Sequence, residues 1–442
     1  MHGRLIGGAV VIGAAVTAGV TVLALIGPGG TTPTSAVPTT DGLARSTAVA
    51  NSSNVLARNI TSTQAQLRDE PQNWLAWATL GAAYVQQGRA TADPTYYPKA
   101  QQALERSLAL NPKDDFVAMI GMATLAAARH DFHGALRLSQ RAVTVNPQSA
   151  AAYAVMTDAL NELGRYPAAI DAVQRAVDLV PGVSTFTRVS YVRELHGDVR
   201  GAVAAMQLAR DDAVDPQDIA FCDYHLGELA FGSGDLAGAV RAYAEGLQVM
   251  PSSPVLLEGR AKVEAARGQT AEAIRDYTAV VAMLPLPQYA IEFGDYLTAV
   301  HRTVEAARQY DLVAVEERLF RANGVNSDLD IAAYDAEHGQ VATAVTAGRD
   351  EWSRRHSIIV ADAYAWALHK SGNDHLALTY ARFATSLGLR NATYYFHKGV
   401  IEHSLGEQAA ARSDLNRAVQ INPYFSPLHA PEARALLRGA WS

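Results

Sequence analysis

Four side chains that could hold a metal ion or form a reactive thiol site lie in one short stretch, FCDYHLGELAFGSGD (Phe221–Asp235). Cys222 is the only cysteine of the chain, and Asp223, His225 and Glu228 follow it closely. Thiolate, imidazole and carboxylate groups are the usual ligands of zinc and related metals. Whether these groups can act together depends on the element that carries them.

That element is predicted to be a helix over 221–231, which ends before a turn at Gly234. At about 100° per residue, Cys222 and Glu228 lie about 240° apart around the helix axis. They cannot reach one metal from the same helix, and no partner helix offers matching ligands. We therefore expect Cys222 to be a small buried residue; a reactive thiol and a metal ligand are the alternatives.

A repeat of about 34 residues places this helix in a larger architecture. One alanine series marks it: Ala100, Ala135, Ala169, Ala202, Ala239, Ala273, Ala307, Ala344, Ala377 and Ala411. A glycine stands five residues before most of these alanines: Gly164, Gly197, Gly234, Gly268, Gly339, Gly372 and Gly406. A proline stands twelve residues after many of them: Pro112, Pro147, Pro181, Pro251, Pro285 and Pro423. The glycine suits a left-handed helix end and the proline stops the next helix, so each unit reads as helix, tight turn, helix.

The unit at 150–181, AAAYAVMTDALNELGRYPAAIDAVQRAVDLVP, resembles the tetratricopeptide repeat. In the first unit, Trp77, Leu80, Gly81 and Tyr84 fit its W-x-x-L-G-x-x-Y pattern. The resemblance implies an all-α fold, a right-handed superhelical solenoid of about ten helix-turn-helix units. We expect these units to start near residues 74, 116, 150, 183, 220, 254, 288, 325, 358 and 392.

Irregular segments divide the chain further. Residues 72–423 form the predicted solenoid, with a capping helix at 53–71 and a C-terminal cap at 424–442. An insertion around TADPTYYP lengthens the first unit, and the unit near Arg302 lacks its turn glycine. No proline follows that unit, so a longer helix and a change of superhelical path are expected near 320–330.

The N-terminal segment is apolar and has the length of a membrane-spanning helix. Leu5–Ile26 is 22 residues without a charge, enough as a helix to cross a hydrocarbon core of about 30 Å. Residues 1–27 are predicted to be an uncleaved anchor, with a cleaved signal peptide as the alternative. Arg4 precedes the segment, and a Pro/Thr/Gly-rich tether at 28–52 follows it. The positive-inside rule then places the repeats outside the cytoplasm, on the membrane or secreted.

Composition excludes several function classes. The 442 residues carry 37 basic and 44 acidic side chains without a basic block, so nucleic acid is not an expected partner. One cysteine rules out an intrachain disulfide and every multi-cysteine zinc pattern. No phosphate-binding loop, G-x-S-x-G or H-E-x-x-H motif occurs, and the repeats leave no room for a catalytic domain. The chain is predicted not to be an enzyme and to need no cofactor.

The remaining candidate site is the inner wall of the superhelix, which in this family is lined by the first helices and holds a peptide or protein segment. Transferred by repeat position, the candidate binding residues are Arg188, Tyr191, Phe221, Tyr224, His225, Glu228, Glu258, Lys262, Tyr289, Glu292, Tyr296 and Trp366. Aromatic and charged side chains together are typical of protein interfaces. The alternative is that the tyrosines pack on adjacent repeats and the charges face water.

Two functions follow from this wall. The favoured one is a non-enzymatic, extracytoplasmic scaffold that binds a protein or peptide segment and assembles a membrane-associated complex. The other is a small-ligand- or metal-sensing accessory protein of a membrane transporter. His397 with His403, or His369 with His375, could ligate a metal, but we expect these histidines to be scattered and solvated.

Overall fold

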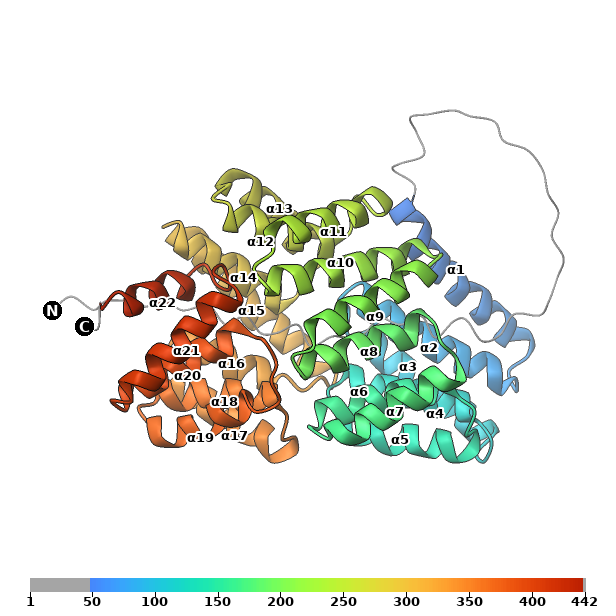
Figure 1. Cartoon of the computed structure of the whole chain (residues 1–442). Coiled ribbons are helices and arrows are strands. Elements are labelled where there is room, and N and C mark those ends of the chain that lie inside the picture. Colours follow the sequence, from blue (N-terminus) through green and yellow to red (C-terminus); the bar gives the residue numbers. More distant parts are fainter. Residues whose placement is uncertain (1–47, 440–442) are drawn as a thin grey trace.

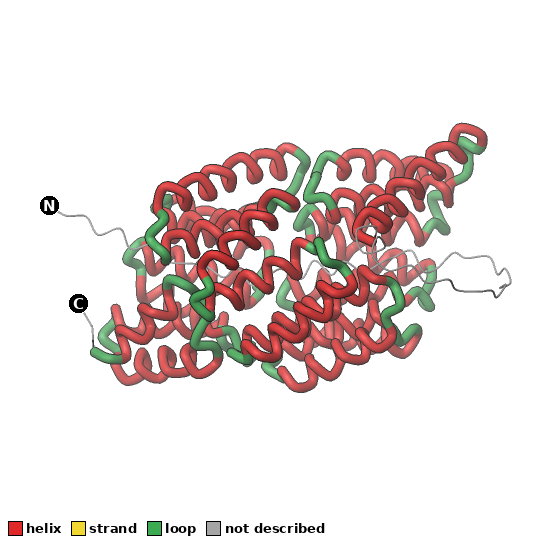
Figure 2. The backbone as a smooth tube through the Cα atoms, turned by 90° about the horizontal axis from the view of Figure 1, so that it is seen from above, coloured by secondary structure: helices red, strands yellow, loops and turns green. Residues whose placement is uncertain are grey.

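The computed structural model describes residues 48–439, and within that range every regular element is a helix (Figure 2). The first eleven helices are α1 (Ala48–Asp69), α2 (Trp74–Ala90), α3 (Tyr96–Leu110), α4 (Phe116–Ala128), α5 (Phe132–Val145), α6 (Ala150–Glu162), α7 (Tyr166–Leu179), α8 (Val183–Leu195), α9 (Val199–Asp212), α10 (Pro216–Gly232) and α11 (Leu236–Val249). The others are α12 (Pro254–Ala266), α13 (Thr270–Met283), α14 (Pro287–Ala299), α15 (Thr303–Ala322), α16 (Asp328–His338), α17 (Val341–Arg354), α18 (Ile358–Lys370), α19 (Asp374–Ala384), α20 (Ala392–Ser404), α21 (Gln408–Ile421) and α22 (His429–Leu437).

Twenty of these helices form ten consecutive pairs, α2/α3 to α20/α21, with α1 before them and α22 after them (Figure 1). The predicted unit starts at 74, 116, 150, 183, 254, 358 and 392 coincide with the first residue of a pair, and the other three lie within four residues of one. The predicted all-α array of about ten units is therefore confirmed.

The ends of the array differ in detail from the predicted domain limits. Helix α1 covers the predicted capping helix but begins at Ala48, so residues 48–52 of the predicted tether are helical. The predicted anchor at 1–27 and the rest of the tether lie outside the described residues. Among residues 48–439, none of the helices has the length and apolar character needed to cross a membrane.

The seventh pair corrects one register of the sequence pattern. Ala306, not Ala307, is the buried small residue of α15, because Ala307 is exposed. Counting back five residues gives His301, which has φ +64° and occupies the left-handed turn position assigned above to Arg302. A left-handed turn can therefore be kept without glycine, at a cost in backbone strain. The longer helix expected there is confirmed, because α15 has 20 residues.

After α15 the chain crosses to the N-terminal repeats. The Asn326 amide donates to the Arg129 carbonyl (3.1 Å), and His130 Nδ1 lies 2.6 Å from the Asn326 carbonyl. Val325 joins the buried cluster of α1–α4. The predicted change of path near 320–330 is thus a segment that packs on the N-terminal repeats. The C-terminal lobe, α16–α22, begins directly after it.

The C-terminal lobe packs back on the N-terminal repeats, as Figure 1 shows for α16–α21 beside α4–α9. The Ile358 amide donates to the Tyr166 hydroxyl (2.9 Å), and His133 Nε2 lies 2.8 Å from the Arg354 carbonyl. Arg355 is buried between the lobes, where it pairs with Glu162 of α6. The superhelix therefore closes on itself instead of leaving an open groove.

The insertion in the first unit contributes to this closure. Ala92, in the loop between α2 and α3, has φ +51° and is buried. It shares an apolar cluster with Leu257, Val280 and Tyr289 of α12–α14. The insertion thus bridges repeats that are far apart in sequence.

Two turn glycines give a matched test of the contact between lobes. Gly164 and Gly268 have nearly the same conformation, φ +72° and +74°. A Cβ on Gly164 would lie 2.1 Å from the backbone oxygen of His356, whereas a Cβ on Gly268 meets nothing within 4 Å. Gly268→Ala is expected to cost about 1 kcal/mol of backbone strain. Gly164→Ala should cost about 1–3 kcal/mol more, because the lobes must separate to make room. Urea unfolding of both variants measures the difference, and equal losses would contradict the close approach.

Candidate functional site

A cavity of about 680 Å³ lies where the lobes and the repeats α8–α14 meet. Its walls come from the first helices α8, α10, α12 and α14, from the crossing segment 325–330, and from segments 389–394 and 422–434 of the C-terminal lobe. The predicted inner wall is therefore one side of a partly enclosed cavity, and segments from distant parts of the chain form the other side.

Ten of the twelve candidate residues line this cavity. They are Tyr191, Phe221, Tyr224, His225, Glu228, Glu258, Lys262, Tyr289, Glu292 and Tyr296. Arg188 and Trp366 are buried elsewhere. Arg188 pairs with Asp158 at 2.7 Å, and the Trp366 ring stacks on His397 with centroids 4.0 Å apart. The assignment of these two residues to the wall is therefore corrected. The position of a residue on a helix does not by itself show whether its side chain lines a cavity or packs against a neighbouring helix.

A charged network occupies the centre of the wall. Lys262 Nζ lies 2.7 and 2.8 Å from the two Glu228 oxygens and 2.8 Å from Glu258 Oε1. The Tyr243 hydroxyl donates to Glu228 (2.5 Å), and the Tyr277 hydroxyl donates to Glu292 (2.9 Å). Lys262 thus joins carboxylates from two successive first helices, α10 and α12.

Burial changes the acid–base behaviour of this network. It raises the pKa of Glu258 well above its ordinary value, and it raises the pKa of Glu292 as well. Burial alone would lower the pKa of Lys262, but Glu228 and Glu258 raise it well above its usual range. The ammonium therefore stays charged, and the raised pKa values of Glu258 and Glu292 favour the protonated form of these two carboxyls.

Other lining groups remain available for a ligand. The Glu194 carboxylate makes no hydrogen bond or ion pair with the described residues, and burial, with Glu228 nearby, raises its pKa to about 7. The buried Tyr296 hydroxyl also has no hydrogen-bond partner among the described residues. Burial lowers the pKa of His225 to about 4, so this imidazole is neutral at pH 7.

The Cys222 stretch forms no joint site. Cys222 is fully buried beside Ala202 and Met206, and burial raises the pKa of its thiol to about 12. Asp223 instead pairs with Arg210 at 2.6 Å. The prediction of a small buried residue is confirmed, and Glu228 of the same helix belongs to the cavity.

The histidine pairs considered from sequence are engaged separately, and the expectation that they are solvated is wrong for His397, which is fully buried beside Asp362. His369 Nδ1 lies 2.6 Å from Asp374, His403 Nδ1 lies 3.1 Å from Gln408, and His375 is exposed. Sequence reasoning missed the half of the wall that comes from distant segments, including Tyr394, Pro423 and Arg434. Glu194 and Asp295 carried a local signal, because each lies three residues after a predicted wall residue, Tyr191 or Glu292, on the same helix face.

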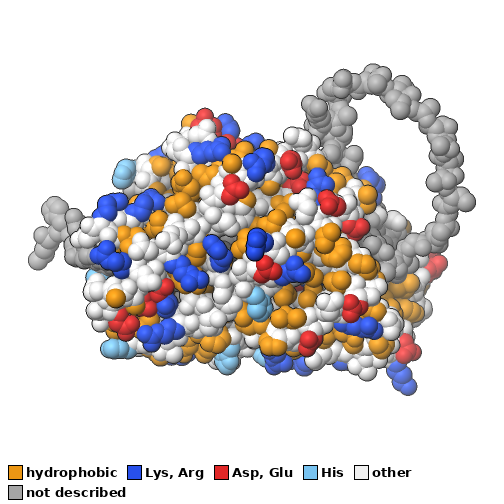
Figure 3. All heavy atoms as spheres, viewed as in Figure 1, with side chains coloured by type: hydrophobic (Ala, Val, Ile, Leu, Met, Phe, Trp, Pro, Cys, Tyr) orange, Lys and Arg blue, Asp and Glu red, His pale blue; other side chains and the backbone are white. Residues whose placement is uncertain are grey.

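On the face in Figure 3, acidic and basic side chains are interspersed, and no extended basic surface is visible. This agrees with the interspersed charges of the sequence.

Comparisons with known proteins agree with the repeat architecture. Two segments, 120–184 and 392–425, match tetratricopeptide repeat models. No curated protein sequence matches the chain. Among solved structures, a thermophilic tetratricopeptide protein of Thermus thermophilus is 23% identical over 39% of this chain and 91% of its own, with a TM-score of 0.35.

Two longer alignments are weaker in identity. The Cut9–Hcn1 hetero-tetramer of APC/C covers 82% of this chain and 76% of its own at 13% identity, with a TM-score of 0.42. A monomeric IFIT1 mutant with Gppp-AAAA covers 74% of this chain and 76% of its own at 14% identity, with a TM-score of 0.45. At these scores the likeness does not extend to function. The 34-residue period, the ten helix pairs and the two family matches identify the chain as a tetratricopeptide repeat protein.

Proposed function

We propose that the chain is a non-enzymatic scaffold that holds a basic segment of a partner protein in its central cavity. Arrays of this family generally serve as protein-interaction scaffolds. The observation that carries the proposal is the set of acidic side chains on one wall: Glu194, Glu228, Glu258, Glu292 and Asp295, from four successive first helices, with Lys262 as the basic side chain that these helices add to the lining. Arg89, Arg355, Arg390 and Arg434 line the cavity from other segments. A lysine, an arginine or a free amino terminus would complement the acidic side chains of that wall.

Aromatic side chains suit the same ligand. Tyr191, Tyr224, Tyr289 and Tyr296 line the wall that carries the carboxylates. A cation over a tyrosine ring gains about 0.5–2 kcal/mol, more where water is excluded. Lys262 already lies 6.0 Å from the Tyr224 ring centroid and 5.6 Å from that of Phe231. The wall therefore already holds one cation in the way proposed for the partner.

Glu194 is the sharpest test of this wall. Glu194→Gln is expected to weaken binding of a short lysine-rich peptide about tenfold, the loss of one charge-assisted contact. In the unaltered chain, affinity should rise from pH 6 to pH 8, because Glu194, which faces Glu228 and Tyr191, loses its proton near pH 7. The variant should show a flatter pH profile. Fluorescence anisotropy with a labelled peptide measures both effects.

Exposed Glu245 on α11 provides the matched control, and Glu245→Gln should leave affinity unchanged. A glutamate-rich peptide should not bind, and added salt should weaken the lysine-rich one. Equal binding of the acidic and basic peptides would overturn the assignment of charge.

A small cationic ligand is the second candidate, favoured by the enclosure of the cavity. Its volume of about 680 Å³ falls within the range of about 300–1,000 Å³ that is typical of small-molecule sites. A sensor accessory to a membrane transporter would use the same wall. Affinity that increases from a diamine to a lysine tripeptide and a hexapeptide supports the scaffold, whereas equal affinity for all three supports the sensor.

The location of the scaffold forms part of the proposal. The uncharged segment Leu5–Ile26, preceded by Arg4, supports a membrane-attached or secreted array outside the cytoplasm. Alkaline phosphatase fused after Ser442 should then be active, and a fluorescent protein that folds only in the cytoplasm should be dark. The opposite pattern would place the array inside.

A further inference from the structure

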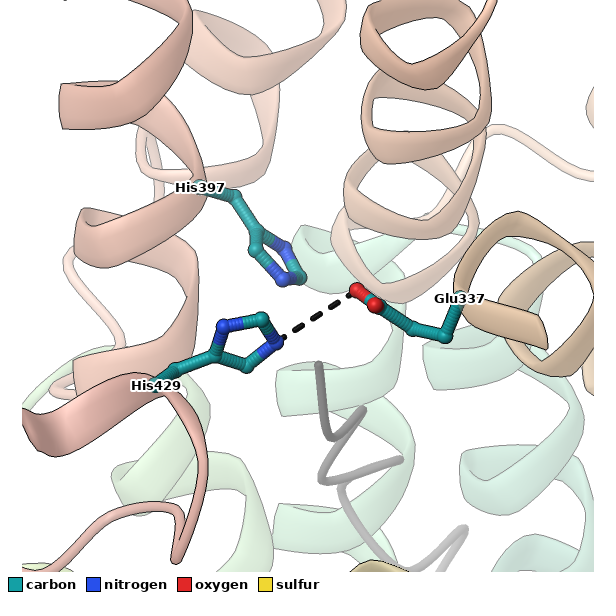
Figure 4. Close-up of side chains that lie close together, drawn as sticks. All are labelled: Glu337, His397 and His429. Carbon is teal, nitrogen blue, oxygen red and sulfur yellow. Dashed lines mark ion pairs between the residues drawn. The ribbon is translucent and has the colours of Figure 1, made fainter. Parts of the chain in front are cut away.

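Three ligand-type side chains from separate helices converge in the C-terminal lobe. Glu337 of α16, His397 of α20 and His429 of α22 each offer one atom, and these atoms lie within 4.8 Å of one another. Figure 4 shows the two imidazoles and the carboxylate pointing toward a common centre. All three side chains are buried, with at most 2% exposure.

The converging atoms lack hydrogen bonds. Among the described residues, Nε2 of His397, Nε2 of His429 and Oε2 of Glu337 are buried without a hydrogen-bond partner. His429 Nε2 lies 3.4 Å from Glu337 Oε1, and Lys370 Nζ lies 3.4 Å from Oε2. Buried polar atoms in this state are unfavourable unless another group satisfies them.

Outer contacts orient all three side chains. His397 Nδ1 lies 3.0 Å from Asp362 Oδ2, and His429 Nδ1 lies 3.1 Å from Glu432 Oε2. When Nδ1 donates to a carboxylate, Nε2 keeps its lone pair for a metal, which is the usual outer shell of zinc-bound histidine. The Trp366 indole N–H donates to Glu337 Oε1.

The local charge suits a divalent cation. Glu337, Asp362 and Glu432 contribute three negative charges, and Lys370 contributes one positive charge. These four side chains leave an excess of negative charge beside the site, which favours a cation. Two imidazoles and one carboxylate also form a donor set that zinc accepts.

We infer that Glu337, His397 and His429 bind one divalent transition-metal ion, best suited to Zn²⁺, which fastens α16, α20 and α22 to one another. Ligand distances of about 2.0–2.2 Å in a tetrahedral site place the donor atoms closer than 4.8 Å, so binding draws them together. The three side chains supply three of the four tetrahedral positions, and a water molecule would take the fourth. The inference does not depend on the proposed function of the cavity.

The experiment uses the full chain, purified in detergent without a histidine tag and stripped with a chelator. One equivalent of Zn²⁺ should bind, and Tm should rise with metal concentration. Co²⁺ in the same site should give the strong visible absorption of tetrahedral coordination. Absence of stoichiometric binding, or an octahedral Co²⁺ spectrum, would overturn the site and leave the three residues as a buried ion pair.

Variants separate this site from the other histidines. His429→Gln should abolish the Co²⁺ spectrum, and Asp362→Asn, which keeps all three ligands, should lower affinity about 10–100-fold. His375→Gln and His403→Gln are the controls and should bind as the unaltered chain does. If His429→Gln does not fold, Asp362→Asn still decides, because unchanged affinity there contradicts the assigned outer shell.

Discussion

Lys262→Met is expected to destabilise the middle repeats by about 3–5 kcal/mol at neutral pH. The substitution removes the ammonium that contacts both Glu228 and Glu258, and the buried carboxylates are then left uncompensated. Hydrogen exchange should report the loss locally, as faster exchange in α10 and α12.

The loss should depend on pH in a defined direction. Burial already raises the pKa of Glu258, and without Lys262 it rises further. A carboxyl with a raised folded-state pKa favours the folded state below its unfolded pKa, and this advantage is lost as pH rises through the folded value. The variant should therefore recover stability toward pH 5. A deficit that grows on acidification would contradict the network.

Two further variants make the comparison specific. Lys113→Met changes an exposed lysine and should alter stability by less than about 0.5 kcal/mol. Glu228→Gln combined with Lys262→Met removes one charge of each sign, and it should recover part of the loss in a double-mutant cycle. Full additivity of the two changes would show that the pair does not interact.

Arg355→Ala is expected to have the second large effect, and it should act on the contact between lobes. The Arg355 side chain is 4% exposed and pairs with Glu162 (10%) and Glu351 (3%), and its guanidinium lies 4.8 Å from the Phe132 ring centroid. Removing it leaves the buried Glu162 carboxylate unpaired, whereas Glu351 keeps its pair with Arg354, and breaking a buried pair costs about 3–5 kcal/mol. Because Glu162 belongs to α6 and Arg355 directly follows α17, the cost falls on the interface.

Small-angle scattering should show a larger radius of gyration for Arg355→Ala as the lobes separate. Arg355→Lys keeps the charge but cannot reproduce the two-pronged contact, so it should be intermediate. Arg349→Ala removes an exposed pair with Asp350 and should change neither size nor stability measurably. An unchanged scattering curve for Arg355→Ala would show that this pair does not hold the lobes together.

The contacts that follow the 34-residue period could be predicted from sequence. Glu228 and Lys262 are one period apart and therefore occupy equivalent positions on neighbouring first helices, where they pair. Glu258 is four residues before Lys262 on the same helix, a spacing that brings side chains together. The prediction that Cys222 is buried rested in the same way on its position around the helix axis, and the structure confirms it.

Where the period is broken, the register could not be read with the same accuracy. His301 takes the turn position without being glycine, so the pattern was displaced by one residue to Arg302 and Ala307. Arg188 and Trp366 were placed on the wall because they occupy inward positions. An inward side chain can line a cavity or pack against another helix, and the segment that lies opposite decides between the two.

The sequence by itself determined the all-α class, the ten units and their boundaries. It also determined the row of charged and aromatic side chains on the first helices. Both follow because local turns and nearest-neighbour packing repeat along the chain. Only the tertiary structure decided that the array closes. Arg355 meets Glu162 across 193 residues, and Glu337, His397 and His429 converge from two repeats and the C-terminal helix α22. Such contacts depend on the small rotation between successive repeats, which accumulates over many units and which no single repeat encodes.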